Sequence, residues 1–364
     1  MQFPGSWTLG LSRYPACLTW ATAFILIACG TVIGTPGRAA GPSPEAEVLH
    51  WWQLRLRRFQ SAPTSPVAVH RVFYLADGQA LYATAYDSKA VDWGVASAAP
   101  AGAVFSVAFR DRKFTTVWKP GLAPVQSLQS WDPETLRADW RDVASPYTWV
   151  EGTLRWGDWP LHLSYHPPYG RVIVFRPLTE RPVNFPSFDL FPYDGRFRFR
   201  ARLIPAERRQ TVWIETSRGL QTPLPDVGWL EFDWQGKPYR LRAFIESGDD
   251  LSVLFIIFRD ATTGKTTYPI GRYVEAERQP DGSYVLDFNK AYVPLCAYSD
   301  AYNCPIPPKE NTRGWAVLAG ERYMGKGVSG GRGSRGPGPR KGPRSQTSLR
   351  SMESSRPKDL TLQV

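Results

Sequence analysis

Short runs of alternating apolar and polar residues, separated by turn residues, are the feature that most constrains the fold of this chain. The run F-R-F-R at 197–200 is the clearest example, and Gln235-Gly236 is a hairpin-like turn. Successive side chains of a strand point to opposite faces, so this alternation is typical of a sheet with one buried face. The run 253–258 is apolar on both faces and predicts a central strand that is covered on both sides.

The composition points the same way. Aromatic residues make up 13% of the 364 residues, and the chain has 31 Gly and 33 Pro. Many aromatic residues with frequent turn residues favour strands over helices. We therefore predict a mainly β protein of two packed antiparallel β units, split near residue 195 into 43–195 and 196–325. A single large β sandwich or barrel is the alternative.

One N-terminal helix is predicted from Ser43 to Gln60. Ser43 can cap it, Pro44 fits its first turn, and acidic residues follow at the positive end of the helix dipole. The predicted apolar stripe is Val48, Trp52, Leu56 and Phe59. Arg55, Arg57 and Arg58 are interpreted as part of a solvated helix face rather than a nucleic-acid-binding patch. A second, short helix is predicted from Asp132 to Asp142.

The segment 283–321 is the densest in side chains that can do chemistry or fix a loop. Asp287 and Asn289 flank an aromatic residue at the end of a predicted strand and point the same way. In one interpretation they cap the following loop by binding its backbone N–H groups. In the other, Asp287 is a general acid or base and Asn289 orients the reactants.

Cys296 and Cys304 enclose a short loop within this segment. In an oxidising compartment they would form a disulfide, which would stabilise the fold by roughly 2–3 kcal/mol. Zinc would require a tighter pair and two further ligands. His162 and His166 share a face of a predicted strand, but no third ligand lies nearby in the sequence. We therefore predict no metal and no cofactor.

This segment resembles a known family. D-F-N-x-A-Y-x-P-x-C from Asp287, C-P-x-P-P-x-x-N from Cys304 and A-G-E at 319–321 are similar to the C-terminal signature of the domain of unknown function 1684 (DUF1684). The resemblance runs from about 171 to 321 and includes Arg272 and Tyr273 upstream. Val293 replaces an asparagine that the family pattern leads us to expect. The family comprises uncharacterised bacterial and archaeal proteins, so the resemblance implies no activity.

The N-terminus predicts export. Residues 16–33 are apolar and are typical of a signal-peptide core or a short membrane span. The run L-I-A-C ending at Cys29 resembles a bacterial lipobox, in which this cysteine is lipidated. Cleavage after Ala39 and an uncleaved anchor are the alternatives for this leader, which we place at 1–40. All three predict an extracytoplasmic body, either membrane-associated or secreted.

Residues 326–364 form a low-complexity basic tail that is predicted to be disordered. The tail carries nine Lys or Arg and two Asp or Glu, and the leader adds two Arg to the formal charge of +11. The remaining body therefore has a charge of only +2, so the basic balance does not predict a nucleic-acid partner.

Between residues 43 and 323 the sequence contains no nucleotide-binding loop, nucleophile elbow or zinc-protease motif. The first functional hypothesis is a membrane-tethered protein that binds a small molecule or an envelope component in a pocket beside 287–311. The predicted polar contacts are Arg272, Tyr273, Asp287, Asn289, Tyr292 and Asn311. One alternative is a hydrolase that uses Asp287, or Glu321, as acid or base at the same place. The other is a purely structural envelope protein.

Overall fold

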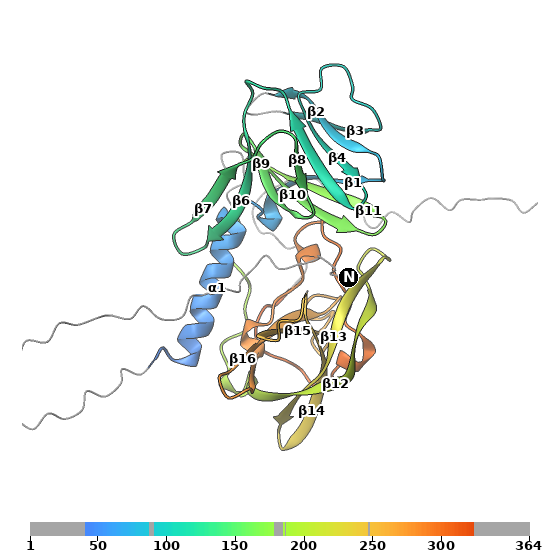
Figure 1. Ribbon diagram of the computed structural model, residues 1–364. Helices are drawn as coiled ribbons and strands as arrows, with labels where there is room; N and C mark the ends of the chain where they lie inside the picture. The colour runs from blue at the N-terminus through green and yellow to red at the C-terminus, as the bar shows by residue number, and fades with distance from the viewer. Residues whose placement is uncertain (1–40, 87–90, 178–184, 186, 247, 324–364) are drawn as a thin grey trace, which may run out of the picture. The chain divides into compact units, whose positions relative to one another are not determined.

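Antiparallel β-sheets dominate the computed structural model, which describes residues 41–86, 91–177, 185, 187–246 and 248–323 (Figure 1). Among these residues one α-helix is present, α1 (Pro44–Ser61), and it precedes all the strands. The predicted fold class, mainly β with a short N-terminal helix, is therefore confirmed. The predicted leader and basic tail lie outside the described residues.

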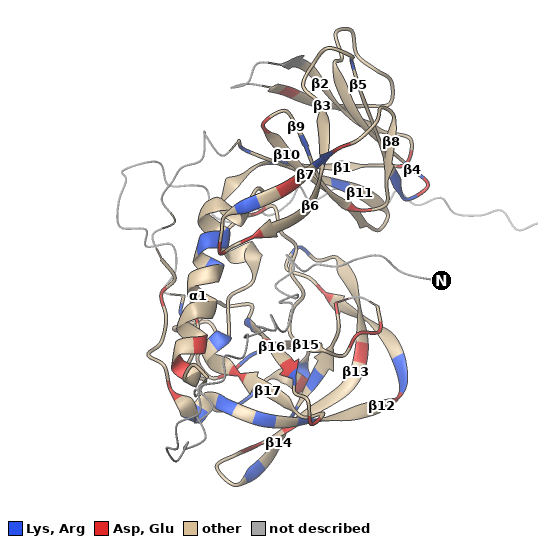
Figure 2. Cartoon of the chain, turned by 60° about the vertical axis from the view of Figure 1, so that its left-hand side comes forward, with Lys and Arg blue, Asp and Glu red and all other residues tan. Residues whose placement is uncertain are grey.

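Helix α1 begins where the capping prediction places it. The Ser43 hydroxyl accepts a hydrogen bond from the backbone N–H of Ala46 at 3.2 Å. Figure 2 shows acidic residues at the start of the helix and basic residues near its end, as the helix dipole favours. The solvated interpretation of the arginines is wrong for Arg55 and Arg58, which are both buried, and only Arg57 is exposed.

Two antiparallel sheets are built from the described residues between 69 and 175. Their strand orders are β1-β11-β10-β9-β6-β7 and β3-β2-β4-β5-β8. The bounds are β1 (Val69–Leu75), β2 (Ala80–Tyr86), β3 (Val91–Ala96), β4 (Phe105–Arg110), β5 (Lys113–Trp118), β6 (Val125–Asp132), β7 (Arg137–Asp142), β8 (Tyr147–Trp149), β9 (Gly152–Trp156), β10 (Trp159–His166) and β11 (Tyr169–Phe175). Phe105 and Trp156, one from each sheet, stack with ring centroids 4.7 Å apart in a shared buried cluster. The two sheets therefore bury their apolar faces against each other.

The second predicted helix, from Asp132 to Asp142, is wrong, because β6 and β7 form a hairpin there. The Asp132 carboxylate accepts hydrogen bonds from the backbone N–H of Glu134 at 2.8 Å and from the Thr135 hydroxyl at 2.6 Å. Leu136 completes the turn with a positive φ of 59°. Aspartate can cap a helix or a turn with the same bonds, and here the strand pairing on both sides selects the turn.

The strands after residue 197 close into a barrel in the order β12 to β17. Their bounds are β12 (Arg198–Glu215), β13 (Gln221–Trp234), β14 (Lys237–Phe244), β15 (Val253–Phe258), β16 (Arg272–Arg278) and β17 (Tyr284–Asp287). The barrel closes because β17 pairs back onto β12, from Arg198↔Asp287 to Ala201↔Tyr284. Strand β15 is almost entirely buried, as its two apolar faces predicted.

Apolar side chains fill the barrel and continue into the chain that follows it. Phe288, directly after β17, packs against Phe258 with ring centroids 5.0 Å apart. A second buried cluster joins β15 and β16 to Ile173 and Phe175 of β11 and to Ala301, Tyr302 and Cys304. The segment 288–321 is therefore packed on the barrel along much of its length.

Gly320 marks a point where this segment approaches another backbone closely. Its φ is +75°, and a Cβ placed on it would lie 2.4 Å from the carbonyl oxygen of Ala291 and 2.6 Å from that of Phe288. Both the left-handed conformation and the absence of a side chain are needed at this position.

We therefore expect Gly320→Ala to lower the free energy of unfolding by about 2 kcal/mol or more, from backbone strain and the clash together. Gly314→Ala is the matched control, because a Cβ at Gly314 would meet nothing within 4 Å. Denaturant unfolding of both variants measures the difference. Equal stabilities would contradict the assigned backbone geometry.

Candidate functional site

The segment 287–311 leaves the barrel after β17 and turns three times. The turns are short 3-10 helices, η4 (Phe288–Lys290), η5 (Leu295–Ala297) and η6 (Lys309–Asn311). Backbone hydrogen bonds between Tyr273 and Tyr292, at 2.8 and 2.9 Å, pair the segment with the start of β16. The predicted site residues of this segment are thus held against the barrel wall.

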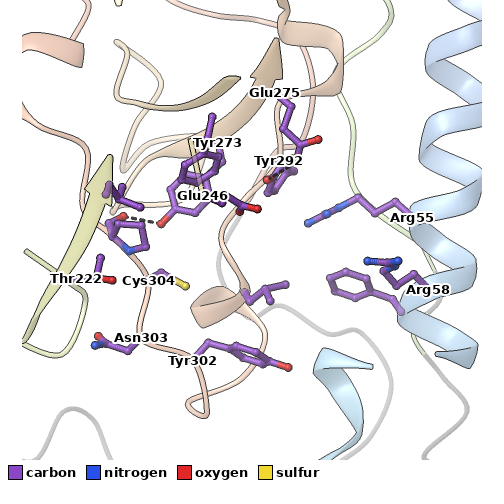
Figure 3. Close-up of a pocket in the computed structure, with 15 residues that line it drawn as sticks. Arg55, Arg58, Thr222, Glu246, Tyr273, Glu275, Tyr292, Tyr302, Asn303 and Cys304 are labelled. Atoms are coloured by element: carbon purple, nitrogen blue, oxygen red, sulfur yellow. Dashed lines mark hydrogen bonds between the residues drawn. The ribbon is translucent and has the colours of Figure 1, made fainter. Parts of the chain in front are cut away.

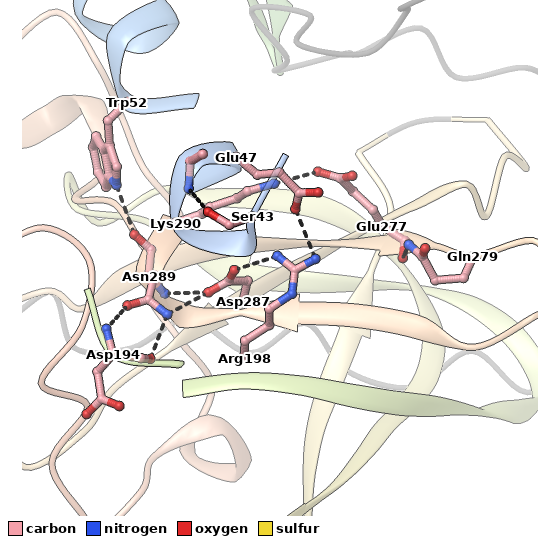
Figure 4. A network of polar contacts seen from close by, with 11 residues as sticks. Ser43, Glu47, Trp52, Asp194, Arg198, Glu277, Gln279, Asp287, Asn289 and Lys290 are labelled. Atoms are coloured by element: carbon pink, nitrogen blue, oxygen red, sulfur yellow. Dashed lines mark hydrogen bonds and ion pairs between the residues drawn. The ribbon is translucent and has the colours of Figure 1, made fainter. Parts of the chain in front are cut away.

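Asp287 has the capping bonds that the first interpretation predicted (Figure 4). Its side chain is 2% exposed. One carboxylate oxygen accepts from the backbone N–H and the side-chain amide of Asn289, both at 2.9 Å, and the other accepts from Arg198 at 3.0 Å. The carboxylate therefore fastens the exit of β17 to the start of β12.

Asn289 is also fully engaged by the protein. Its side-chain oxygen accepts from the backbone N–H of Asp194 at 2.9 Å, and its amide nitrogen donates to the Asp194 carbonyl at 3.0 Å. Its own carbonyl accepts a hydrogen bond from the indole N–H of Trp52 at 2.9 Å (Figure 4). This residue connects the barrel, the chain before β12 and helix α1.

Arg272 is fully buried at the start of β16, and its guanidinium hydrogen-bonds to the backbone near the end of the described chain. Its guanidinium donates to the carbonyls of Ala319 at 2.5 Å and Val317 at 2.8 Å, and it lies 3.6 Å from the Asp260 carboxylate. Arg272 and Asp260 therefore form a buried ion pair. Burial lowers the pKa of Arg272 to about 10, and Asp260 opposes this shift.

Asn311 joins two strands that barely pair with each other. In the register of β14 and β15 the paired residues are Phe244 and Phe255. The Asn311 side-chain oxygen accepts from the backbone N–H of Arg242 at 2.6 Å, and its amide donates to the carbonyls of Arg242 and Ile257 at 3.0 and 2.8 Å. One side chain thus supplies ladder bonds that the two strands lack.

Tyr273 and Tyr292, in contrast, line a cavity between the barrel and α1 (Figure 3). Its volume is about 90 Å³. The lining residues are Arg55, Arg58, Phe59, Thr222, Leu224, Glu246, Phe255, Tyr273, Glu275, Tyr292, Leu295, Tyr302, Asn303, Cys304 and Pro305. The structure therefore separates the predicted set: two tyrosines face the cavity, whereas Arg272, Asp287, Asn289 and Asn311 do not line it.

The cavity combines apolar walls with a few polar groups. Leu224, Phe255 and Leu295 contribute apolar surface. The Tyr292 hydroxyl donates to the Glu275 carboxylate at 3.1 Å, and the Tyr273 hydroxyl donates to the carbonyl of Pro305 at 2.5 Å. Burial raises the pKa of Glu275.

Arg55 also lines the cavity, although its sequence pattern was interpreted as part of a solvated helix face. It comes from α1, is 6% exposed, and points toward Tyr292 and Glu275 (Figure 3). Its Cζ lies 4.2 Å from the centroid of the Tyr292 ring. A signal was present in the sequence: Arg55 lies three residues after Trp52 and four before Phe59, so it belongs to the same helical stripe.

Cys296 and Cys304 are free thiols in the structure, so the predicted disulfide is not present. The backbone N–H of Cys296 contacts the Cys304 sulfur at 3.3 Å. A hydrogen bond with Cys304 lowers the pKa of the Cys296 thiol, whereas burial raises the pKa of Cys304. The two sulfurs are neighbours, and Cys304 lines the cavity.

Within the described ranges no group of three or more His, Cys, Asp or Glu side chains is arranged to hold a metal ion. His162 has a local partner, since its Nδ1 lies 3.0 Å from the Thr153 hydroxyl. Its Nε2 lies 3.9 Å from the Glu151 carboxylate. His162 is thus hydrogen-bonded within the β-sheet.

Comparison with known proteins agrees with the resemblance seen in the sequence. No curated protein matches the chain. A solution NMR structure of an uncharacterized protein from Haloarcula marismortui is 39% identical, covers 40% of this chain and 80% of its own, and has a TM-score of 0.33. Residues 183–322 match the family described as "Protein of unknown function (DUF1684)". The chain therefore belongs to the DUF1684 family, through the barrel and the segment that follows it.

Proposed function

We propose that this protein binds a small molecule in the cavity beside the segment 287–311, and that it does so outside the cytoplasm. The observation that carries the proposal is the cavity itself, which α1 and the barrel enclose together. Small-molecule sites are typically concave and apolar, with a few placed polar groups. This cavity has that character, and the predicted contacts Tyr273 and Tyr292 belong to its lining.

The shape of the segment 287–311 also supports binding at this place. Tyr292, Leu295, Tyr302, Asn303, Cys304 and Pro305 all line the cavity. Asn289 and Asn311, which do not line it, hold the two ends of the segment through buried hydrogen bonds. A wall fixed in this way is preformed, which lowers the conformational cost of binding a ligand.

Export and membrane attachment remain proposals that rest on residues 16–33 and Cys29, which lie outside the described residues. In the part of the chain that is described, no helix is both long and apolar enough to span a membrane. Export has a consequence for the adjacent thiols of Cys296 and Cys304, because an oxidising compartment would join such a pair.

The enzyme alternative has less support. Asp287 lines a separate, wider groove of about 440 Å³ with Glu47, Arg198 and Lys290. Its carboxylate already accepts three hydrogen bonds from the protein, so little capacity is left for a substrate. Glu321 is fully buried with bonds from the backbone N–H of Val293 and the Tyr298 hydroxyl, and it does not line the cavity.

For the binding function, we expect at least one of three small probes to raise the unfolding temperature of the full chain in a saturable manner. The probes are propionate, propionamide and 1-propanol. A ligand that binds only the folded state stabilises it, so binding raises the unfolding temperature. Leu295→Trp should fill the cavity and remove the response. Leu318→Trp, at a side chain that is 51% exposed, should leave it unchanged.

Thermal unfolding monitored by fluorescence gives both results. If the three probes leave the wild-type midpoint unchanged at every concentration, the cavity does not bind small molecules and the structural alternative gains support.

Asp287→Asn tests the enzyme alternative against the capping role. We expect the variant to lower the free energy of unfolding by about 2–3 kcal/mol, because an amide cannot replace the charge-assisted bonds of a buried carboxylate. Asp249→Asn is the control, since Asp249 is 94% exposed in its ion pair with Arg209 and should change stability by less than about 0.5 kcal/mol. Urea denaturation measures both. A variant as stable as the wild type would favour the catalytic role over the capping role.

For export, we expect the protein purified from the cell envelope to carry a Cys296–Cys304 disulfide. Its intact mass should be two hydrogens lower than that of the reduced chain, and the two thiols should resist alkylation before reduction. Protein made in a reducing cytoplasm is the control. Full alkylation of the envelope-derived protein would argue against an oxidising location.

A further inference from the structure

We infer that the ligand of the cavity is a short-chain carboxylate whose charged group binds the guanidinium of Arg55. The inference rests on the proposed binding function and adds the chemical class of the ligand. It starts from a buried positive charge that the described protein leaves without a direct partner.

Two nitrogens of Arg55 carry the argument. Nε and Nη2 are buried and have no hydrogen-bond partner among the residues that the structure describes. These two nitrogens form one side of the planar guanidinium, and their N–H groups point in parallel. That fork matches the two oxygens of a carboxylate, which is how arginine commonly binds such groups. Buried polar groups are otherwise almost always hydrogen-bonded, so an open fork indicates a missing acceptor.

The rings around Arg55 position it without using its donors. Its Cζ lies 4.2 Å from the ring centroid of Tyr292, 5.2 Å from that of Phe59 and 5.5 Å from that of Phe188. Contacts over a ring face hold the guanidinium plane by cation–π attraction. The N–H groups at its edge therefore stay available.

The acidic side chains nearby do not fill the place of the acceptor. Glu321 and Glu275 act on Arg55 electrostatically, and Glu246 also lines the cavity. None of the three forms a hydrogen bond or ion pair with Arg55 in the described structure. Burial raises the pKa of Glu321 to about 8, which weakens its negative charge near neutral pH. Glu275 accepts its hydrogen bond from Tyr292 instead. The positive charge of Arg55 is thus only partly compensated.

The size of the cavity limits the rest of the ligand. Its volume of about 90 Å³ is well below the roughly 150 Å³ of an engineered cavity that holds benzene. About three water molecules, at about 30 Å³ each, would fill it. A carboxylate with about two to four carbon atoms has this size, and Leu224, Phe255 and Leu295 provide apolar surface for its chain.

The test compares propionate with its neutral analogues propionamide and 1-propanol on the full chain, by isothermal titration calorimetry at constant ionic strength. We expect propionate to bind roughly 10- to 100-fold more tightly than propionamide, as expected for hydrogen bonds between charged groups. Arg55→Met should remove this preference. Arg57→Met, the same change at an exposed position of the same helix, should retain it within twofold.

Arg55→Met is also expected to unfold at a temperature no lower than that of the ligand-free wild type, because it removes an uncompensated buried charge at similar volume. Arg55→Lys provides a second variant that keeps the charge but lacks the fork. It should bind propionate at least tenfold more weakly than the wild type.

The outcomes separate this inference from the proposed function. If propionamide or propanol binds as tightly as propionate, the cavity binds small molecules but the carboxylate assignment is wrong. The assignment is also wrong if both Arg55 variants keep the wild-type affinity for propionate. If the wild type binds none of the three probes, the proposed function itself fails.

Discussion

The segment from Phe288 to Glu321 lies on the barrel outside the regular strands, and side chains join scattered backbone contacts in satisfying its N–H and C=O groups. Buried backbone groups need hydrogen bonds wherever they lie, and a chain without regular structure must find them elsewhere. Arg272 meets this need with bonds to the carbonyls of Ala319 and Val317. Asp260 contributes by accepting from the backbone N–H of Val317 at 2.7 Å. The rest of the site depends on the segment being held in this way.

Helix α1 docks on the part of the segment that these contacts fix. The Trp52 indole reaches the carbonyl of Asn289, whose side chain is tied to Asp194 and Asp287. When α1 packs on the segment, Arg55 becomes buried and water no longer solvates it fully. Burying a charge in this manner is costly unless something compensates, and the aromatic rings compensate only in part. The cavity therefore lies between α1 and the segment on which it docks, and it contains the buried charge of Arg55, which is only partly compensated.

Much of the fold could be predicted because the decisive signals are local. Ser43 caps α1 as expected, and the apolar run of β15 is buried as its pattern predicts. The predicted helix from Asp132 failed because an aspartate cap serves turns and helices alike, and pairing between β6 and β7 decided the outcome. Barrel closure could not be predicted, since it depends on β17 pairing with β12 across a long stretch of sequence.

The candidate site shows the same division between local and distant interactions. Asp287, Asn289 and Asn311 stand out in the sequence because they are polar residues in an apolar, proline-rich segment. Their hydrogen bonds account for their presence: each supports backbone groups that lack strand partners. A polar residue in such a segment is therefore a weak indicator of ligand contact.

Arg55 is the opposite case, because its position in a helical stripe of the sequence did not predict a role in ligand binding. Its role depends on Tyr292, Phe59 and Phe188 meeting around it, and only the folded chain brings them together. Arg55 and Arg272 are both buried arginines that differ in how much of their hydrogen-bonding capacity the fold uses. Arg272 donates to backbone carbonyls, pairs with Asp260 and leaves only Nε without a partner, whereas both Nε and Nη2 of Arg55 lack an acceptor among the described residues.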